Sequence, residues 1–340
     1  MSDVLIEEST LENIASAIRN KNSLSTTYKV SEMAIAIDAF QKSGFDMEDV
    51  ATKSNISGNI FGNASFVGDY AFYSCSSLTA VSFPACKTIG SNAFEFCYSL
   101  TTANFSVCTY IDLYAFRYCS SLTTVSFPSC TSIGNYAFQE CSRLTTASFP
   151  VCENIENYAF YDCYSLTTAN FPSCKTIGAS AFRSCRSLTT VSFPSCTSMG
   201  SYAFYTCKSL TTASFPSCTS MGSCAFYDCQ SLTTVSFPSC TSIGSSAFAY
   251  CSSLTTANFP VCTNIGNGAF FYCLNLISLY LNSVSSVPTL GAGVFNSTPI
   301  GGYTTSTGGV YGSVFVPSSL YQSFLTATNW SSISSRIVSV

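Results

Sequence analysis

Residues 121–142 read SLTTVSFPSCTSIGNYAFQECS, and this stretch is one unit of a repeat that fills most of the chain. The Phe of its Ala-Phe pair recurs every 22 residues without a slip, at positions 72, 94, 116, 138, 160, 182, 204, 226, 248 and 270. A Cys follows each of these Phe residues by three positions and a Leu by six. A fixed period of this length is typical of a solenoid, in which like residues of successive units stack.

Each unit contains two short extended segments and one tight turn. Residues 125–127 (VSF) alternate inward and outward positions and are followed by Pro128, as in a short strand. Residues 131–134 (TSIG) predict a second short extended segment that the Gly closes. The spacing of Ala137, Phe138 and Cys141 predicts a single helical or 3₁₀ turn. We therefore predict a β-rich solenoid of 22-residue coils. It should begin before the first Ala-Phe pair, because Phe61 already stands at the strand-Phe position of the unit and Val67 at its Ile position.

The segment from Ile133 to Leu144 reads IGNYAFQECSRL, and ten such segments stand in the chain. This pattern resembles the BspA-like leucine-rich repeats, whose mark is I-G-x-x-A-F-x-x-C-x-x-L followed by a short strand and Pro. The resemblance covers about residues 56–282 and implies a leucine-rich-repeat-like array. A second Cys series, from Cys86 to Cys262, departs from the many relatives that carry an ordinary apolar residue there. Family members are bacterial surface adhesins and related binding proteins, so the resemblance implies a binding function.

Three parts of the chain differ in composition. Residues 1–45 predict a small α-helical module, with Leu11, Ile14 and Ile18 on one apolar stripe of its first helix. Residues 46–282 form the repeat solenoid, and residues 283–340 resemble the capping segment that ends such arrays. The pieces LENIASAIR (11–19) and YKVSEMAIAI (28–37) resemble the N-terminal helical segment of phage tail and minor structural proteins of Gram-positive hosts. That resemblance implies that residues 1–45 attach the protein to a larger assembly.

Twenty cysteines raise the question of metal sites and disulfides. No C-x₂-C hook occurs, and the two Cys series alternate at intervals of 11, which spreads the thiols instead of gathering them around a metal. Stacked coils about 4.8 Å apart would allow disulfides between neighbouring units, so that alternative stays open. A ladder of parallel side chains with nine members favours unpaired, buried thiols. Cys224 lies outside both series, and we expect it to be more exposed.

Composition excludes several function classes. The chain has no His, which removes every His-dependent triad and acid–base pair, and its few acidic residues form no recurring close pair. We therefore predict no catalytic residues, no cofactor and no metal. A net charge of −4 argues against nucleic acid as a partner, because phosphate binding needs clustered Lys and Arg. The chain contains no run of about 18 apolar residues, so we predict no insertion into a membrane. Its first residues lack the features of a secretory signal.

Variation within the unit is confined to the turn, at the residues two before the Phe and one, two and four after it. These positions hold 14 of the 20 Tyr, whereas the outward strand positions are nearly all Ser, Thr or Asn. Tyr and Arg provide large contact areas with polar tips, as binding loops do. The competing interpretation is that residues vary at these solvent-facing positions because packing does not constrain them, or that Tyr covers the stacked Phe residues of the core. The residues we predict to bind ligand are Tyr158, Tyr161, Tyr164, Arg183, Arg186, Tyr202 and Tyr205.

These observations lead to one main functional hypothesis and two alternatives. The main hypothesis is a phage tail-associated receptor-binding or host-adhesion protein, located in the virion and made in the bacterial cytoplasm without a signal peptide. Its partners would be a host cell-surface protein or glycan and, through residues 1–45, other virion or tail proteins. The first alternative is a bacterial surface adhesin or secreted interaction protein. The second is a structural protein that assembles into a fibre, which leaves a homo-oligomer open.

Overall fold

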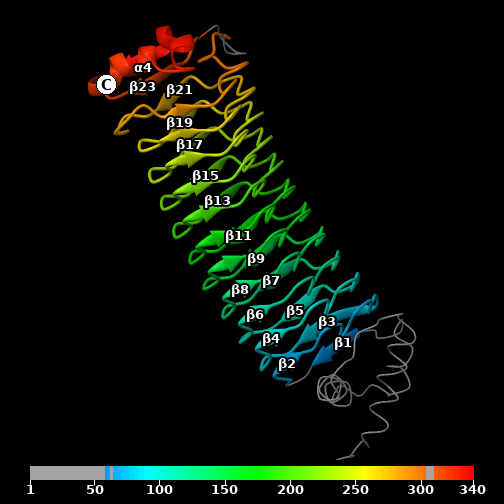
Figure 1. Ribbon diagram of the computed structural model, residues 1–340. Helices are drawn as coiled ribbons and strands as arrows, with labels where there is room; N and C mark the ends of the chain where they lie inside the picture. Colours follow the sequence, from blue (N-terminus) through cyan, green and yellow to red (C-terminus); the bar gives the residue numbers. More distant parts are fainter. Residues whose placement is uncertain (1–57, 62–63, 304–309) are drawn as a thin grey trace, which may run out of the picture.

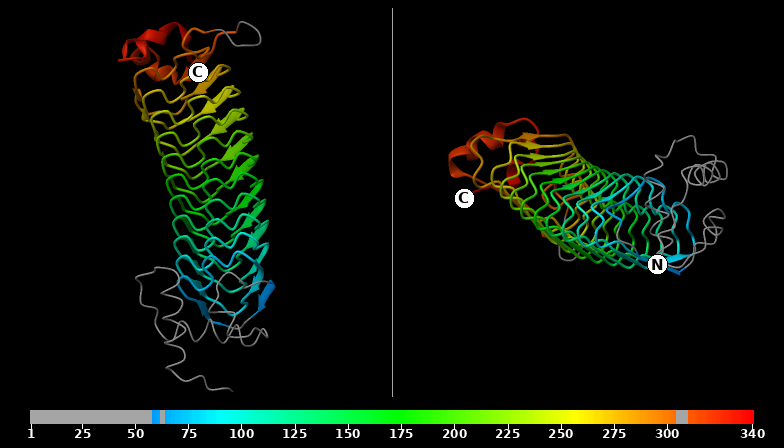
Figure 2. Two further views of the ribbon diagram at one scale, coloured as in Figure 1. Left: turned by 90° about the vertical axis from the view of Figure 1, so that its right-hand side faces the viewer. Right: turned by 90° about the horizontal axis from the view of Figure 1, so that it is seen from below.

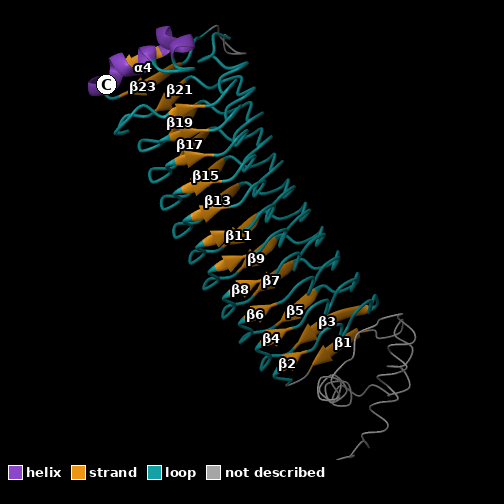
Figure 3. Ribbon diagram, viewed as in Figure 1, coloured by secondary structure: helices purple, strands orange, loops and turns teal. Residues whose placement is uncertain are grey.

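The computed structural model describes residues 58–61, 64–303 and 310–340, which build one elongated parallel β-solenoid (Figure 1). Each coil contributes one strand to each of two rows, and turns join the rows (Figure 3). Viewed along its length, successive coils overlie one another in register (Figure 2). The predicted solenoid is confirmed, and Val67 lies at its predicted position because it pairs with Ile89. The predicted position of Phe61 is wrong by one residue, because Phe61 pairs with Ser82 and not with Phe83, after a register shift between Gly58 and Asn59. The predicted helical module of residues 1–45 lies outside the described residues.

The first row of strands carries the longer segments and is divided into two sheets. One sheet has the order β1-β3-β5-β7-β9-β11 and the other β13-β15-β17-β19-β21-β23-β24, all parallel. The bounds of the first sheet are β1 (Gly58–Phe61), β3 (Leu78–Ser82), β5 (Thr102–Asn104), β7 (Thr124–Ser126), β9 (Thr146–Ser148) and β11 (Thr168–Asn170). Those of the second are β13 (Thr190–Ser192), β15 (Thr212–Ser214), β17 (Thr234–Ser236), β19 (Thr256–Asn258), β21 (Ser278–Tyr280), β23 (Ser313–Val316) and β24 (Ile337–Ser339).

The second row is one continuous sheet of eleven two-residue strands. Its strands are β2 (Phe66–Val67), β4 (Thr88–Ile89), β6 (Tyr110–Ile111), β8 (Ser132–Ile133), β10 (Asn154–Ile155), β12 (Thr176–Ile177), β14 (Ser198–Met199), β16 (Ser220–Met221), β18 (Ser242–Ile243), β20 (Asn264–Ile265) and β22 (Thr289–Leu290). Each ends at a tight passage between coils. A Cβ on Gly134, for example, would lie 2.7 Å from the backbone carbon of Asp112.

The turn around the Ala-Phe pair is not the helical or 3₁₀ turn that the residue spacing predicts. Tyr158 and Asp162, two residues before and after Phe160, have φ of +59° and +58°, which no right-handed helix contains. The Phe160 amide donates to the carbonyl of Ala181 in the next coil at 2.7 Å, whereas the Tyr161 amide donates to Tyr158 within the turn at 3.1 Å. Alternate amides therefore bind the neighbouring coil, and this ladder of hydrogen bonds replaces a helix.

Two ladders of stacked Phe rings fill the core. The ring centre of Phe160 lies 5.1 Å from that of Phe138 and 5.2 Å from that of Phe182, and the ring planes are within 5° of parallel. The strand Phe residues form the second ladder, in which Phe149 stacks on Phe171 at 5.2 Å. The ladders meet edge to face, as Phe160 does with Phe171 at 5.7 Å. Both arrangements are favourable aromatic geometries, so each coil is stabilised chiefly by its two neighbours.

The cysteines form two further ladders in the same core. All twenty are thiols, and all except the half-buried Cys224 are buried. In one ladder the thiol donates to a carbonyl of the preceding coil, as Cys97 does to Phe72 at 3.1 Å. In the other it donates to a carbonyl two residues ahead, as Cys86 does to Thr88 at 3.1 Å. Burial raises the pKa of Cys86 to about 11, so this thiol stays protonated and packs as a small hydrophobic group.

The C-terminal residues cover the end of the Phe ladder. The η2 (Ser318–Leu320), α4 (Tyr321–Thr326) and η3 (Ser331–Arg336) helices gather there, beside β23 and β24 (Figure 1). Phe295 stacks on Phe270 at 6.2 Å, and the Trp330 ring lies 6.2 Å beyond it. The buried Trp330 indole donates to the carbonyl of Pro288 at 2.8 Å. No helix in the described part of the chain is long and apolar enough to cross a membrane.

Candidate functional site

The turn face of the solenoid comprises, in every coil, the residues two before and one, two and four after the ladder Phe. The residues two before and two after have positive φ throughout, and in the ten coils only Gly268 among them is glycine. Tyr, Ser, Asn and Cys all occupy these left-handed positions, which are costly for residues with a Cβ. The inter-coil hydrogen bonds therefore fix the backbone, and the side chains are left to differ.

The structure brings the seven predicted ligand-binding residues together on three successive coils. Arg183 lies at the centre, with its guanidinium carbon 5.7 Å, 5.8 Å and 4.7 Å from the ring centres of the tyrosines of the neighbouring coils. Those three tyrosines are Tyr161, Tyr202 and Tyr205. Arg186 lies 5.1 Å from the Tyr164 ring, and Tyr158 packs edge-on against Tyr161 at 5.8 Å. We call these seven residues the turn-face cluster.

The turn-face cluster is only partly open to solvent. Arg186 is exposed and Tyr202 is 39% exposed, whereas Arg183 and the other four tyrosines are half-buried. Each end of the cluster continues as stacked rings, with Tyr136 on Tyr158 at 4.6 Å and Tyr205 on Tyr227 at 4.8 Å. The Nε of Arg183 is buried and has no hydrogen-bond partner. Covering the Phe ladder is thus part of what these side chains do, alongside any binding.

Carboxylates shape the electrostatics of the cluster. Asp162 is 8% exposed and lies among Tyr161, Tyr164 and Glu140 of the preceding coil. Burial and the charge of Asp162 raise the pKa of Tyr164 to about 12. Burial and Asp162 also raise the pKa of Glu140. The raised pKa values of Tyr161 and Tyr164 keep these two phenols protonated at neutral pH, so they can donate hydrogen bonds to a ligand.

An earlier coil repeats the same motif of Arg between Tyr rings. Arg117 lies 4.8 Å from the ring centres of both Tyr114 and Tyr118. Its guanidinium also pairs with the buried carboxylate of Glu95 at 3.0 Å. Arg183 forms no such ion pair within the described ranges, and its guanidinium contacts three Tyr rings, one of which, Tyr161, also lies beside the Asp162 carboxylate. An acidic group of a ligand would therefore pair with Arg183 without displacing an existing ion pair.

Beside the cluster lie the hydroxyls of Ser184 and Thr206, which are 3.3 Å apart, and the half-buried thiol of Cys224, whose pKa is raised by burial. Within residues 58–61, 64–303 and 310–340, no three His, Cys, Asp or Glu side chains converge as metal ligands do. The cluster can provide ring faces, hydroxyl donors and two guanidinium groups, which suits reversible binding.

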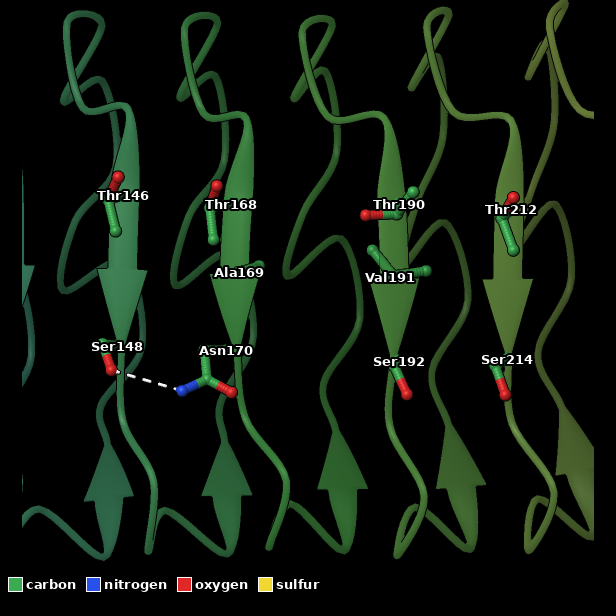
Figure 4. A pocket seen from close by; sticks show the side chains of 10 residues that line it. All are labelled: Thr146, Ser148, Thr168, Ala169, Asn170, Thr190, Val191, Ser192, Thr212 and Ser214. Carbon is green, nitrogen blue, oxygen red and sulfur yellow. Dashed lines mark hydrogen bonds between the residues drawn. The ribbon is translucent and has the colours of Figure 1, made fainter.

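Sequence reasoning missed a hollow of about 520 Å³ on the strand face, meaning the outward residues of the first strand row. It opens where the row divides between β11 and β13 (Figure 4). The lining residues are Thr146, Ser148, Thr168, Ala169, Asn170, Thr190, Val191, Ser192, Thr212 and Ser214. Inward strand residues alternate between Val and Ala from Val81 to Ala147, and Ala169 breaks that alternation. Because Ala169 follows Ala147 at this position, the side chains fill less of the core here than a Val would. This break in the alternation is the feature of the sequence that could have predicted the hollow.

The repeat has the sequence features of a known family. The family model described as BspA type leucine rich repeat region (6 copies) matches residues 52–167 and 153–277. The chain belongs to the BspA-type leucine-rich repeat family. Repeat scaffolds of this BspA type are typically non-enzymatic and protein-binding or adhesin-like. Among curated proteins, no sequence matches the chain.

Several solved structures are similar to the BspA-type array described here. A leucine rich cell surface protein from Faecalibacterium prausnitzii A2-165 is 27% identical, with 71% of this chain and 76% of that one covered and a TM-score of 0.42. A leucine-rich repeat protein from Bacteroides ovatus is 22% identical over 82% and 88% of the two chains, with a TM-score of 0.38. The pneumococcal vaccine antigen PcpA is 19% identical over 77% and 78%, with a TM-score of 0.39.

Proposed function

We propose that this BspA-type protein is a non-catalytic adhesion protein that binds a host cell-surface protein or glycan through the turn-face cluster. The observation that carries the proposal is the position of Arg183, held among Tyr161, Tyr202 and Tyr205 without an acidic partner in the described structure. Tyr and Arg are the residues that most often dominate binding energies at protein surfaces. Rings and guanidinium that are already held in place lose little conformational entropy when a ligand arrives.

A finer assignment is a phage tail-associated receptor-binding protein located in the virion. Its support is the resemblance of residues 1–45 to N-terminal segments of phage tail proteins, and these residues would attach the solenoid to other tail proteins. Immunogold labelling of phage particles with an antibody against the solenoid tests this assignment. Label on bacterial cell walls and none on particles would instead favour a bacterial surface adhesin.

The binding proposal is tested with a triple variant, Tyr161→Ser, Arg183→Ser and Tyr205→Ser. We expect attachment of the fluorescently labelled protein to whole Gram-positive cells to be lost, as measured by flow cytometry. Each lost cation–π contact is worth about 0.5–1 kcal/mol at a partly exposed site, so the fold should survive with a modest drop in melting temperature. Circular dichroism of the variant checks this point.

The matched control changes three outward strand residues, Ser126→Ala, Ser148→Ala and Ser192→Ala. These side chains belong to the strand face, and two of them line its hollow. The control should bind as the unmodified protein does. If the control lost attachment and the turn-face variant kept it, the strand face would be the binding surface and the proposal would be wrong.

A further inference from the structure

The strand face changes character at its C-terminal end. From β5 to β19 the last outward residue of every strand is Ser or Asn. Register then places Asn258 beside Tyr280, Tyr280 beside Phe315 and Phe315 beside Val338, across β19, β21, β23 and β24. A polar column thus becomes aromatic and apolar over its last three strands. Val338 is 37% exposed and Tyr280 and Phe315 are half-buried, so the described residues leave this end partly open.

The aromatic side chains of this end are held in a fixed arrangement. The rings of Tyr280 and Phe315 stack at 4.6 Å with an interplanar angle of 13°. Tyr311, 49% exposed, precedes β23, and exposure alternates from Tyr311 through Gly312 to Phe315. This alternation places Tyr311 and Phe315 on the same side of the chain. We call Tyr280, Tyr311, Phe315, Arg336 and Val338 the aromatic end of the strand face.

One cation accompanies these rings. The guanidinium carbon of Arg336 lies 3.9 Å from the centre of the Tyr311 ring. Arg336 is also the only charged side chain between residues 229 and 340, because the last acidic residue before it is Asp228. Asp228 pairs with Lys208 at 3.4 Å, several coils away. In the described part of the chain, therefore, no Asp or Glu side chain pairs with Arg336.

We infer that the aromatic end of the strand face binds an acidic sugar residue of a glycan. The stacked rings of Tyr280 and Phe315 present their edges outward, and these edges provide an apolar surface against which the C–H groups of a sugar ring would pack. The Arg336 guanidinium, fixed over Tyr311, would form a bidentate, charge-assisted pair with the sugar carboxylate. Hydroxyl and amide groups of Ser278, Ser313 and Asn258 lie in the adjoining register positions, where sugar hydroxyls would find partners. This surface is separate from the turn-face cluster and goes beyond the proposed function.

Charge favours a single acidic sugar unit over an acidic peptide. One guanidinium in a region of 112 residues that has no other charged side chain matches one carboxylate, whereas a peptide with several acidic residues would leave further charges unpaired. The acidic N-terminal segment of a second copy is such a peptide, with nine Asp and Glu in residues 1–55. It would give self-association in place of sugar binding, and the test separates the two.

The test uses the full chain and a hexuronic acid oligosaccharide, with the methyl ester of the same oligosaccharide as an uncharged probe. Isothermal titration should show at least tenfold tighter binding of the acid than of the ester, and weaker binding at higher salt. Arg336→Gln should remove the preference for the acid, and Tyr280→Ser should weaken binding of both probes. Lys175→Gln, which removes a cation paired with Glu153 on the other sheet, should change neither.

Three results would overturn the inference. One is an unmodified protein that binds neither probe, and another is an Arg336→Gln variant that keeps the full preference for the acid. The third is self-association, measured by analytical ultracentrifugation, that disappears in Arg336→Gln, since this would assign the surface to a second copy of the chain. Loss of cell attachment in the turn-face variant is measured separately, so failure of one proposal does not decide the other.

Discussion

The turn face and the strand face are built on the same Phe core but obey different constraints. On the turn face, side chains vary from coil to coil, and almost every left-handed position is held by a residue other than glycine. On the strand face from β5 to β19, outward side chains are small, polar and uncharged. The turn backbone is imposed by amides that donate to the next coil, so its side chains need not specify it. Recognition residues can therefore collect on the turn face without loss of the fold.

The strand face shows the opposite dependence. Its regularity rests on the volume of the inward residue, and two consecutive Ala residues accompany the break between β11 and β13. Ala169 is half-buried, whereas every other inward residue of β5 to β19 is buried, although Ala103 and Ala213 keep 8% and 6% exposure. A change of two carbon atoms in the core is thus felt on the strand face, whereas the turn face absorbs exchanges as large as Ser for Tyr.

The largest expected effect concerns the core that both faces share. Phe160→Ala removes a ring stacked on both sides and should cost about 3–5 kcal/mol of unfolding free energy. Phe149→Ala, in the ladder beneath the strand face, should cost a similar amount. Guanidinium denaturation measures both. A loss in only one of the two variants would show that the faces do not rest on a common core.

Phe295→Ala is the control for position along the rod. Phe295 stacks on Phe270 at 6.2 Å, more loosely than the rings in the middle of the ladder. Each unit of a solenoid is stabilised by its contacts with adjacent units, so a cavity near the end should reduce the free energy of unfolding by less than one at Phe160. Equal losses at Phe160 and Phe295 would contradict the stacked-ladder account.

A smaller effect of opposite sign is expected at the hollow. Ala169→Val adds two carbon atoms beside the break and should stabilise the protein by up to about 1.5 kcal/mol, at about 0.8 kcal/mol for each buried carbon. The matched change Ala147→Val inserts the same atoms at a fully buried position and should destabilise by about 1–3 kcal/mol. A higher melting temperature for Ala169→Val and a lower one for Ala147→Val would confirm that Ala169 leaves the core beneath the strand face underfilled. Changes of the same sign in both variants would contradict it.

The smallest effect concerns protons on the turn face. Burial and the neighbouring Asp162 raise the folded-state pKa of Glu140 above its ordinary value of about 4.3. The folded state therefore holds this proton more tightly than the unfolded state, and Glu140 favours folding more as pH falls from 7 towards that ordinary value. Glu140→Gln should reduce the change in melting temperature between pH 7 and pH 5. The exposed Glu156→Gln serves as the control, and an equal reduction in both would count against the Glu140–Asp162 pair.

Much of this fold was predictable because its period is strict. Phe138, Cys141 and Leu144 recur at fixed intervals, and the only arrangement that buries all of them is a stack of coils. The left-handed turn was not predictable, because the same two positions hold Tyr, Ser, Glu and Thr in different coils, most of which do not favour positive φ, and the conformation comes from the neighbouring coil. For the same reason the columns of the turn-face cluster could be predicted, but the position of Arg183 between three rings could not.

Register gives the two proposed surfaces a fixed offset along the rod. The strand that follows the Tyr205 turn is β15, and the first aromatic strand is β21, three strand steps further along the order β15-β17-β19-β21. At about 4.8 Å a step, the offset is roughly 14 Å. Deleting or duplicating one 22-residue unit between them would change it by one step and leave every ladder continuous. A branched ligand that reaches both surfaces would bind with an effective concentration set by that step, so the number of coils could tune avidity without any new contact.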